Sequence, residues 1–364
     1  MSGSSPPGAP PETPRRNGTL PAETPLAAAI IVLFEPDWAQ VIANLGCLSG
    51  QVGVIILVDN TPAPVPPPGS LPDTAVLIVL GRNTGIAHAQ NIGAAEAERR
   101  GASHLVFFDQ DSRISCSLVT RLLDALATLE ALGEKVAAVG PRPFDTTKGE
   151  RHAPPFVAIE PVGRRFTRVL HLISSGSLVP LESWRVVGPL DASLFIDSVD
   201  HEWCWRARRQ GYSSFVDETS IMPHALGSTV VRFFGQTMRD TLPVRLYYQF
   251  RNQVRLMLHY RSLPVPRGWR VKRLATLPIK FVANLLLMPD RWTRARHMIA
   301  GIRDGVLDRG GPLAASPGPR NGGKSMLATS SEGGRSEPAE DHGTGLYTLR
   351  RPAASRRVKA RRRP

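Results

Sequence analysis

The sequence has 364 residues, only three of them cysteines, and it contains no long apolar run. No stretch approaches the roughly 18–20 consecutive apolar residues of a membrane-spanning helix. Residues 1–25 are rich in Pro, Ser and Gly and lack the basic-then-apolar order of a secretory signal, which predicts a disordered arm on a cytoplasmic protein. Cys47, Cys116 and Cys204 have no metal-ligand spacing and lie far apart, so we expect three separate reduced thiols that act as small buried hydrophobes.

Positive charge is plentiful but unevenly placed. The formal net charge is +14, and residues 311–364 hold 11 Lys/Arg against 4 Asp/Glu, which is +7. This segment is predicted to be a disordered basic tail that ends in the polybasic run 356–363. Nucleic acid and an anionic membrane surface both suit such a run, and a solvated tail without a specific partner fits equally well.

Apolar runs and helical periods alternate between residues 25 and 140, which predicts a mainly parallel α/β sheet with helices on both faces. After residue 140 the order is less regular. Beyond residue 242, an apolar residue every fourth position predicts an amphipathic helix, and a more apolar helix follows at 275–288 with basic residues around it. The second helix either lies in a membrane interface or packs on the preceding domain. Strands are predicted at 28–34, 52–58, 75–80, 103–108, 136–139, within 169–180 and at 212–217, and helices at 37–48, 86–100, 117–132 and 200–210.

Two carboxylates directly follow the apolar strand at 103–108. Asp109 and Asp111 are spaced i, i+2, which puts both side chains on one side of a strand. At the carboxyl end of a parallel strand that side opens onto a ligand crevice. Paired carboxylates there suit a hard divalent cation that is also held by substrate phosphates. The alternative is a solvated Asp-rich turn, since this pattern also arises by chance.

Polar clusters follow two other predicted strands. Asp59 can accept a hydrogen bond from a pyrimidine imide, although an Asp-Asn turn is the common explanation. Asn83, Gly85 and Asn91 surround a helix start, where close backbone approach and the helix N-terminus favour a phosphate or a base edge. Helix capping by Asn83 alone would explain part of this cluster.

Residues 195–203 (Phe-Ile-Asp-Ser-Val-Asp-His-Glu-Trp) hold three carboxylates between aromatic residues that could wall a sugar site. A carboxylate in a partly apolar cleft can have its pKa tuned to deprotonate a hydroxyl. We favour Asp200 for this role. Asp197 and Glu202 have a structural alternative, in which they orient partners or cap the helix.

Taken in order, these motifs resemble the family-two glycosyltransferases of the GT-A fold. The Asp-Gln-Asp-Ser form, with Gly-Ile-Ala and Ala-Gln-Asn before it, resembles the rhamnosyltransferase branch that builds bacterial surface polysaccharides. The resemblance covers residues 28–310. It departs from the family at residues 33–36, where Leu-Phe-Glu-Pro replaces the usual Thr-Tyr/Phe-Asn-Pro. The motifs are Val58-Asp59-Asn60, Asn83-Thr84-Gly85-Ile86-Ala87, Ala89-Gln90-Asn91-Ile92-Gly93, Phe108-Asp109-Gln110-Asp111-Ser112, Ser174-Ser175-Gly176, Phe195-Ile196-Asp197, Asp200-His201-Glu202-Trp203-Cys204, His224, Tyr247-Tyr248 and Arg251-Asn252.

The resemblance implies a role for each candidate residue. Asp59 would contact the base of a nucleotide-sugar donor, and Asp111 would bind Mg²⁺ or Mn²⁺ bridging the donor diphosphate, with Asp109 beside the ribose or sugar. His224 matches a histidine that completes the metal site in relatives. Asp200 matches the general base. Asn83, Gly85 and Asn91 would hold the nucleotide end, and the expected acceptor-binding or orienting residues are Asp197, Glu202, Trp203, Ser175 and Gly176.

We therefore predict an inverting, metal-dependent glycosyltransferase, with dTDP-L-rhamnose as the favoured donor. The expected acceptor is a cell-surface polysaccharide or lipid-linked glycan, reached from the cytoplasmic face of the plasma membrane with peripheral contact to anionic lipid. One alternative is the same fold with UDP-galactofuranose or a UDP-hexose as donor. Another is a non-catalytic nucleotide- or nucleic-acid-binding protein, although the acidic ligand face argues against specific nucleic acid. The predicted domains are a disordered arm at 1–25, a GT-A domain at 26–240, a helical extension at 241–310 and a disordered basic tail at 311–364.

Overall fold

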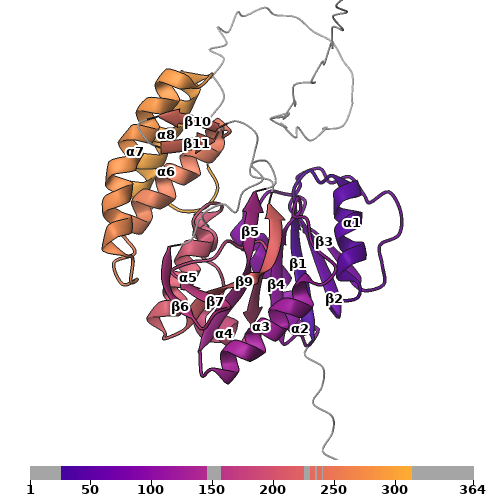
Figure 1. Ribbon diagram of the computed structural model, residues 1–364. Helices are drawn as coiled ribbons and strands as arrows, with labels where there is room; N and C mark the ends of the chain where they lie inside the picture. Colours follow the sequence, from indigo (N-terminus) through magenta and orange to yellow (C-terminus); the bar gives the residue numbers. More distant parts are fainter. Residues whose placement is uncertain (1–25, 146–156, 225–229, 234–235, 240, 314–364) are drawn as a thin grey trace, which may run out of the picture. The chain divides into compact units, whose positions relative to one another are not determined.

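The structure is a computed structural model that describes residues 26–145, 157–224, 230–233, 236–239 and 241–313 (Figure 1). The predicted arm at 1–25 and nearly all of the predicted basic tail at 311–364 lie outside the described residues.

Within these residues, a sheet of nine strands has the order β3-β2-β1-β4-β8-β5-β9-β7-β6. β1 pairs in parallel with both β2 and β4, β3 is parallel to β2, and β5 is parallel to β9. β8 runs antiparallel between β4 and β5. β7 pairs antiparallel with both β6 and β9. The predicted α/β architecture with a central sheet is confirmed, but the sheet is mixed rather than mainly parallel, since four of its eight strand pairings are antiparallel. The strands are β1 (Ala27–Leu33), β2 (Val54–Asp59), β3 (Ala75–Val79), β4 (His104–Asp109), β5 (Val136–Asp145), β6 (Ala158–Val162), β7 (Phe166–Val169), β8 (Ser177–Pro180) and β9 (Ser213–His224).

Helices cover both faces of this sheet because the central strand is apolar on both sides. β1 is buried along its whole length. Its alternate residues Ala27, Ala29, Ile31 and Leu33 pack with α1 (Trp38–Leu48) and α3 (Leu118–Ala131). The side chains between them face the opposite way. They pack with α2 (Ile86–Arg99), α4 (Leu181–Val187) and α5 (Val199–Arg209).

Several elements differ from the sequence prediction. The segment 169–180 is not one strand and turn but the end of β7, a connection and the short strand β8. The strand predicted at 136–139 continues as β5 to Asp145, past a register shift in its pairing with β9. β6, α4 and a separate hairpin of β10 (Val230–Phe233) and β11 (Gln236–Arg239) were not predicted. Strands of four or five residues and the seven-residue helix α4 are too short to display a clear periodicity.

Three helices complete the described chain: α6 (Pro243–Leu258), α7 (Arg267–Leu287) and α8 (Arg291–Val306). α6 matches the predicted amphipathic helix, α7 begins earlier than the predicted 275–288 helix, and α8 was not predicted. α6 and α8 pack closely, because a Cβ built on Gly301 would lie 2.4 Å from the Tyr247 carbonyl oxygen. None of the helices in the described ranges combines the length and the apolar character needed to cross a bilayer.

The cysteine prediction is wrong for two of the three residues. Cys47 on α1 and Cys116 before α3 form a disulfide, with their Cα atoms 4.4 Å apart. The two are 69 residues apart in sequence, and it is the packing of α1 and α3 on one face of the sheet that brings them together. Cys204 is free and buried, as predicted.

Candidate active site

The carboxyl ends of neighbouring parallel strands bring the predicted acidic residues to one edge of the sheet. Asp59 is the last residue of β2 and Asp109 the last of β4, with β1 between them. Gln110 joins the ends of β1 and β4, since its side chain accepts from the Phe34 N–H at 2.7 Å and donates to the Phe34 carbonyl at 3.0 Å. In an open parallel sheet this edge is where ligands bind.

Asp109 and Asp111 form an acidic pair at this edge. Burial raises the pKa of Asp109 to about 6, and the charges of Asp111 and Asp200 add to this effect while Arg245 opposes it. The carboxylates therefore repel one another, and a hard divalent cation would relieve that repulsion. No group of three or more His, Cys, Asp or Glu side chains with metal-binding geometry occurs among the described residues. Two carboxylates fit a cation that takes its remaining oxygen ligands from phosphates and water.

His224, the other expected metal ligand, is the last residue of β9. Its backbone pairs with Asp145 of β5. Its side chain lies outside the described part of the structure, so its role as a metal ligand stays a prediction.

The residues that we expect to contact the nucleotide form hydrogen bonds that fix the loops at this edge of the sheet. Asp59 is buried and accepts from the Thr61 N–H at 2.9 Å. The Asn60 amide donates to Asn83 Oδ1 at 3.1 Å, and Asn83 Oδ1 also accepts from the Gly85 N–H at 3.0 Å. The Asn91 amide makes two hydrogen bonds, both of 2.9 Å, with the backbone of residue 190. Their contacts to a nucleotide stay predictions, and their structural role is to fix this edge.

Gly85 is placed where no other residue fits. It precedes α2 with φ +85°, and a Cβ there would lie 2.6 Å from the Phe195 carbonyl oxygen. The close approach joins the start of α2 to the loop that precedes α5.

Ser175 and Gly176 lie in the turn before β8. Ser175 Oγ is 2.5 Å from Ser112 Oγ, directly after the acidic pair. Gly176 has φ +82° and donates its N–H to the Phe107 carbonyl at 2.7 Å. The turn therefore supports the end of β4, and the acceptor-binding or orienting role of these two residues stays a prediction.

The loop between the 3₁₀ helix η1 (Ala192–Leu194) and α5 has a strained backbone. Phe195, Asp197 and Ser198 have φ values of 65°, 66° and 66°. Such conformations cost about 1–3 kcal/mol each and persist only where neighbouring structure enforces them. The enforcing contacts come from α6: the buried Asn252 amide donates to the carbonyls of residues 194, 196 and 197 at 2.9, 2.8 and 2.8 Å.

Asp200 lies in the first turn of α5, half-buried beside two imidazoles. Its Oδ1 accepts from the His201 N–H at 2.9 Å and lies 3.0 Å from His201 Nδ1. The His201 ring in turn stacks on His171, with centroids 3.9 Å apart. Burial alone would raise the pKa of Asp200, but His201 and His171 outweigh it and hold this pKa below its usual value. The lowered pKa favours the ionised carboxylate, which is the form that can accept a proton.

Glu202 and Trp203 point into the protein. Glu202 is buried and forms a bidentate ion pair with Arg206, with both distances 2.9 Å. Burial raises its pKa, and Arg206 opposes this. Trp203 is buried in the core, stacks on Trp184 and donates from Nε1 to the Gly188 carbonyl at 2.9 Å. These contacts fit the orienting role predicted for Glu202, whereas Trp203 does not form the expected wall of a sugar site because its ring packs under α4.

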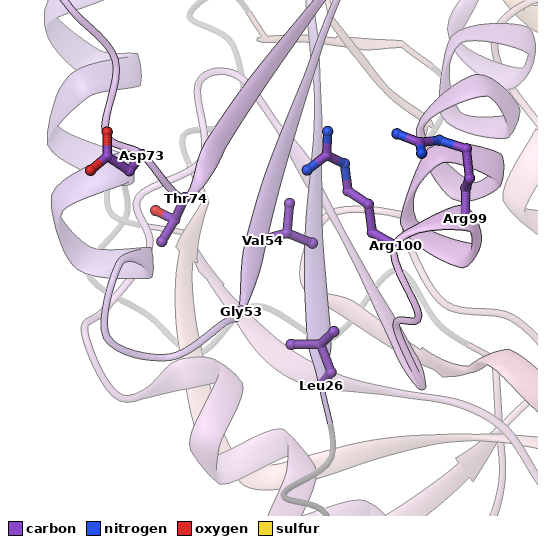
Figure 2. A pocket seen from close by; sticks show the side chains of 7 residues that line it. All are labelled: Leu26, Gly53, Val54, Asp73, Thr74, Arg99 and Arg100. Carbon is purple, nitrogen blue, oxygen red and sulfur yellow. The ribbon is translucent and has the colours of Figure 1, made fainter.

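A pocket of about 490 Å³ lies at the opposite end of the strands (Figure 2). It is lined by residues next to the amino ends of β1, β2 and β3 and by the end of α2, namely Leu26, Gly53, Val54, Asp73, Thr74, Arg99 and Arg100. Because none of the clustered carboxylates reaches this end of the sheet, the pocket is separate from the candidate active site.

No family model matches the chain. Among curated proteins, it is 34% identical over 250 residues to the dTDP-rhamnosyl transferase RfbF of Shigella flexneri, which covers 65% of this chain and 81% of the relative. The chain belongs to the family-two glycosyltransferases, in their rhamnosyltransferase-like branch. An uncharacterized protein of Mycobacterium tuberculosis (strain ATCC 25618 / H37Rv) is 26% identical over 163 residues, 43% of this chain and 59% of the relative.

The matches among solved structures are more distant. Staphylococcus aureus TarS, residues 1–349 in complex with UDP-GlcNAc, gives a TM-score of 0.45 at 12% identity and covers 77% of this chain and 82% of that one. GalNAc-T7 with UDP, GalNAc and Mn²⁺ gives a TM-score of 0.42 at 11% identity and covers 69% and 54%. The assignment rests on the Shigella relative: the protein is a glycosyltransferase that uses a nucleotide sugar.

The structure adds residues to the site that sequence reasoning did not single out. Arg245 forms a bidentate ion pair with Asp197 at 3.0 and 3.1 Å and influences Asp109 electrostatically. His171 reaches Asp200 through His201. Arg245 and Asp197 are 48 residues apart, so no local pattern could have revealed their pairing.

We expect Gly85→Ala to weaken binding of a nucleoside diphosphate and to lower the free energy of unfolding by about 1–3 kcal/mol. The physical reason is the overlap with the Phe195 carbonyl together with the positive φ. Gly81→Ala is the control, since Gly81 also has a positive φ (+64°) but no atom lies within 4 Å of its Cβ position. Urea unfolding and calorimetric titration with dTDP or UDP measure both effects. Equal affinities in the two variants would contradict this role of Gly85.

Proposed function

We propose that this glycosyltransferase transfers L-rhamnose from dTDP-L-rhamnose, with inversion, to a polysaccharide or lipid-linked glycan acceptor. One observation carries the mechanism: Asp200, whose pKa is held below its usual value by His201 and His171, lies within electrostatic reach of Asp109 at the carboxyl edge of the sheet. This proximity supports a mechanism in which Asp200 accepts a proton near an edge that would bind the diphosphate. The donor identity is supported by the relative from Shigella flexneri, which is described as a dTDP-rhamnosyl transferase.

In this mechanism Asp111, with Asp109 beside it, would hold Mg²⁺ or Mn²⁺, and the bound cation would stabilise negative charge on the departing diphosphate. Asp200 takes the proton from an acceptor hydroxyl. The acceptor oxygen forms its bond to the anomeric carbon from the side opposite the diphosphate, as the bond to the diphosphate oxygen breaks. Attack from the opposite side inverts the configuration.

Turnover over a panel of nucleotide sugars tests the proposed donor and the metal together. We expect product from dTDP-L-rhamnose, loss of turnover in EDTA and recovery with Mg²⁺ or Mn²⁺, because the paired carboxylates need a cation to bind a diphosphate. Mass detection of the glycosylated acceptor is the measurement. Turnover only with UDP-galactofuranose or a UDP-hexose would establish the alternative donor. Full activity in EDTA would refute the metal, and no turnover with any donor would support a binding protein.

Asp200→Asn keeps the shape of the side chain but removes the proton acceptor. We expect kcat to fall by roughly 100-fold or more, in line with general-base contributions, while donor affinity stays near that of the wild type. Glu202→Gln is the matched control, since Glu202 is engaged by Arg206. If Glu202→Gln loses turnover and Asp200→Asn keeps it, the base is Glu202.

The pH profile gives a second readout for Asp200. His201→Asn removes an imidazole that lowers the pKa of Asp200. The pKa should then rise, so the acidic limb of the kcat/KM profile should move to higher pH. If the acidic limb does not move in this variant, Asp200 is not the group whose ionisation the kcat/KM profile reports.

We also propose peripheral contact between α7 and an anionic membrane surface. Val271, Leu274, Val282 and Leu286 are 65%, 65%, 43% and 68% exposed and lie on one side of this helix by their spacing. Trp292, at the start of α8, is 69% exposed, and tryptophan is enriched at membrane interfaces. Residues 262–306 contain nine Lys/Arg against two Asp/Glu, which complements anionic lipid. The predicted contribution of the tail at 311–364 concerns residues outside those described.

The double substitution Leu274→Glu with Leu286→Glu tests this surface. Burial of one Leu side chain is worth roughly 1.5–3 kcal/mol, so we expect binding to phosphatidylglycerol vesicles to weaken at least about tenfold. Val186→Glu on α4 is the control, because Val186 is 50% exposed on a helix outside this surface. Vesicle sedimentation measures the binding. Equal binding of the double variant and the wild type would exclude α7 as the contact.

A further inference from the structure

The inner side of α7 carries positive charge where an amphipathic helix usually carries apolar residues. Lys280 is half-buried, and its ammonium group donates to the Gln249 side chain on α6. Arg273 lies two turns earlier on the same side of α7, with its guanidinium 5.4 Å from the centre of the Trp269 ring. On α6, Arg245 lies one turn before Gln249 and on the same side. Lys280 therefore contacts Gln249 from α7, Arg245 lies one turn from Gln249 on α6, and the charges of Arg245 and Arg273 both act on Lys280.

Two members of this cationic cluster (Arg245, Arg273 and Lys280) have no ion-pair partner among the described residues. Arg245 pairs with Asp197, but within the described chain neither Lys280 nor Arg273 forms an ion pair, and Arg273 Nε is buried without a hydrogen-bond partner. Burial lowers the pKa of Lys280 to about 8; Asp197 opposes this effect, and Arg273 and Arg245 add to it. Buried cations are usually paired, so an unpaired group points to an anionic ligand.

Arg245 links the cluster to the candidate active site, through its ion pair with Asp197 and its electrostatic interaction with the acidic pair. Asp197 is the main influence that raises the pKa of Arg245, and Asp109 and Asp111 add to it. The same guanidinium thus interacts with the loop before α5 and with the acidic pair at the end of β4. An anion bound by the cluster would lie beside a cation held by that pair, which is the arrangement that a diphosphate with a divalent metal requires.

We propose that Arg245, Arg273 and Lys280 form a binding site for the diphosphate group of a substrate. The inference rests on the proposed function, in which the acidic pair holds a cation at the diphosphate. It adds a ligand class for three residues outside that pair. The arginines supply planar, two-pronged donors and Lys280 a compact charge, the combination that suits phosphate oxygens. Two substrates can bring this group: the nucleotide donor, and an acceptor glycan carried on a lipid diphosphate.

The first experiment uses inorganic diphosphate as the probe, with the full-length protein in EDTA so that no metal bridges the ligand to the acidic pair. We expect Lys280→Gln and Arg273→Gln each to weaken diphosphate binding at least tenfold in calorimetric titration, and Lys280→Arg to retain it. Lys272→Gln is the matched control, because Lys272 is an exposed cation on the same helix. Unchanged affinity in folded Lys280→Gln and Arg273→Gln would overturn the proposal.

The second experiment identifies the source of the diphosphate. If it comes from the donor, the same two variants should bind dTDP at least tenfold more weakly in the presence of Mg²⁺. If it comes from the acceptor, dTDP affinity should be unchanged, while KM should rise at least tenfold for a glycan on an alkyl diphosphate and not for the same glycan on a neutral alkyl chain. Both results support the site. Because diphosphate binding in EDTA does not depend on the donor sugar or on turnover, its outcome is separate from that of the proposed function.

Discussion

The hydrogen bonds from Asn252 to the loop before α5 are the interaction on which the rest of the site depends. One buried amide is shared among three carbonyl groups of this loop, and these contacts hold the loop in its left-handed backbone conformation. The adjacent Arg251, also fully buried, binds the carbonyls of residues 193 and 194. Without these contacts the strained loop would relax, and Asp200, which lies at the start of the helix that follows it, would lose its position within electrostatic reach of Asp109. The helices after residue 241 are therefore part of the site rather than an appendage.

The sequence alone was sufficient to predict the acidic edge, because its signals are local. A buried parallel strand is an apolar run, and the residues that end it lie next to those that end its neighbour; Asp59 and Asp109 follow from this rule. The contacts that could not be predicted join distant segments. The Arg245–Asp197 pair, the Cys47–Cys116 disulfide and the inward turn of Trp203 each depend on how helices pack on the sheet. Trp203 on α5 points inward because it packs on Trp184 of α4. α4 has only seven residues, so the sequence showed no helical periodicity that would have predicted it.

α7 shows why a periodic pattern does not reveal which side of a helix is buried. Its apolar residues Val271 and Leu274 face solvent, while Lys280 lies against α6. A helix that only covered a core would have the reverse arrangement. Both sides of α7 are therefore unfavourable in an isolated, ligand-free protein, one because it exposes apolar surface and the other because it desolvates charge. Contact with lipid outside and with an anion inside would remove both costs.

The same reasoning applies to the site as a whole. In the acidic pair, burial and the neighbouring carboxylates raise the pKa of Asp109 to about 6. In the cationic cluster, burial chiefly lowers the pKa of Lys280 to about 8. A raised carboxyl pKa and a lowered ammonium pKa each mean that the folded state disfavours the charged form, so near neutral pH both groups reduce stability. A diphosphate with its divalent cation carries the complementary charges to each cluster. Binding of such a substrate would then remove the destabilisation that the two clusters cause. The charges that lower the stability of the ligand-free protein would be the same charges that bind the substrate.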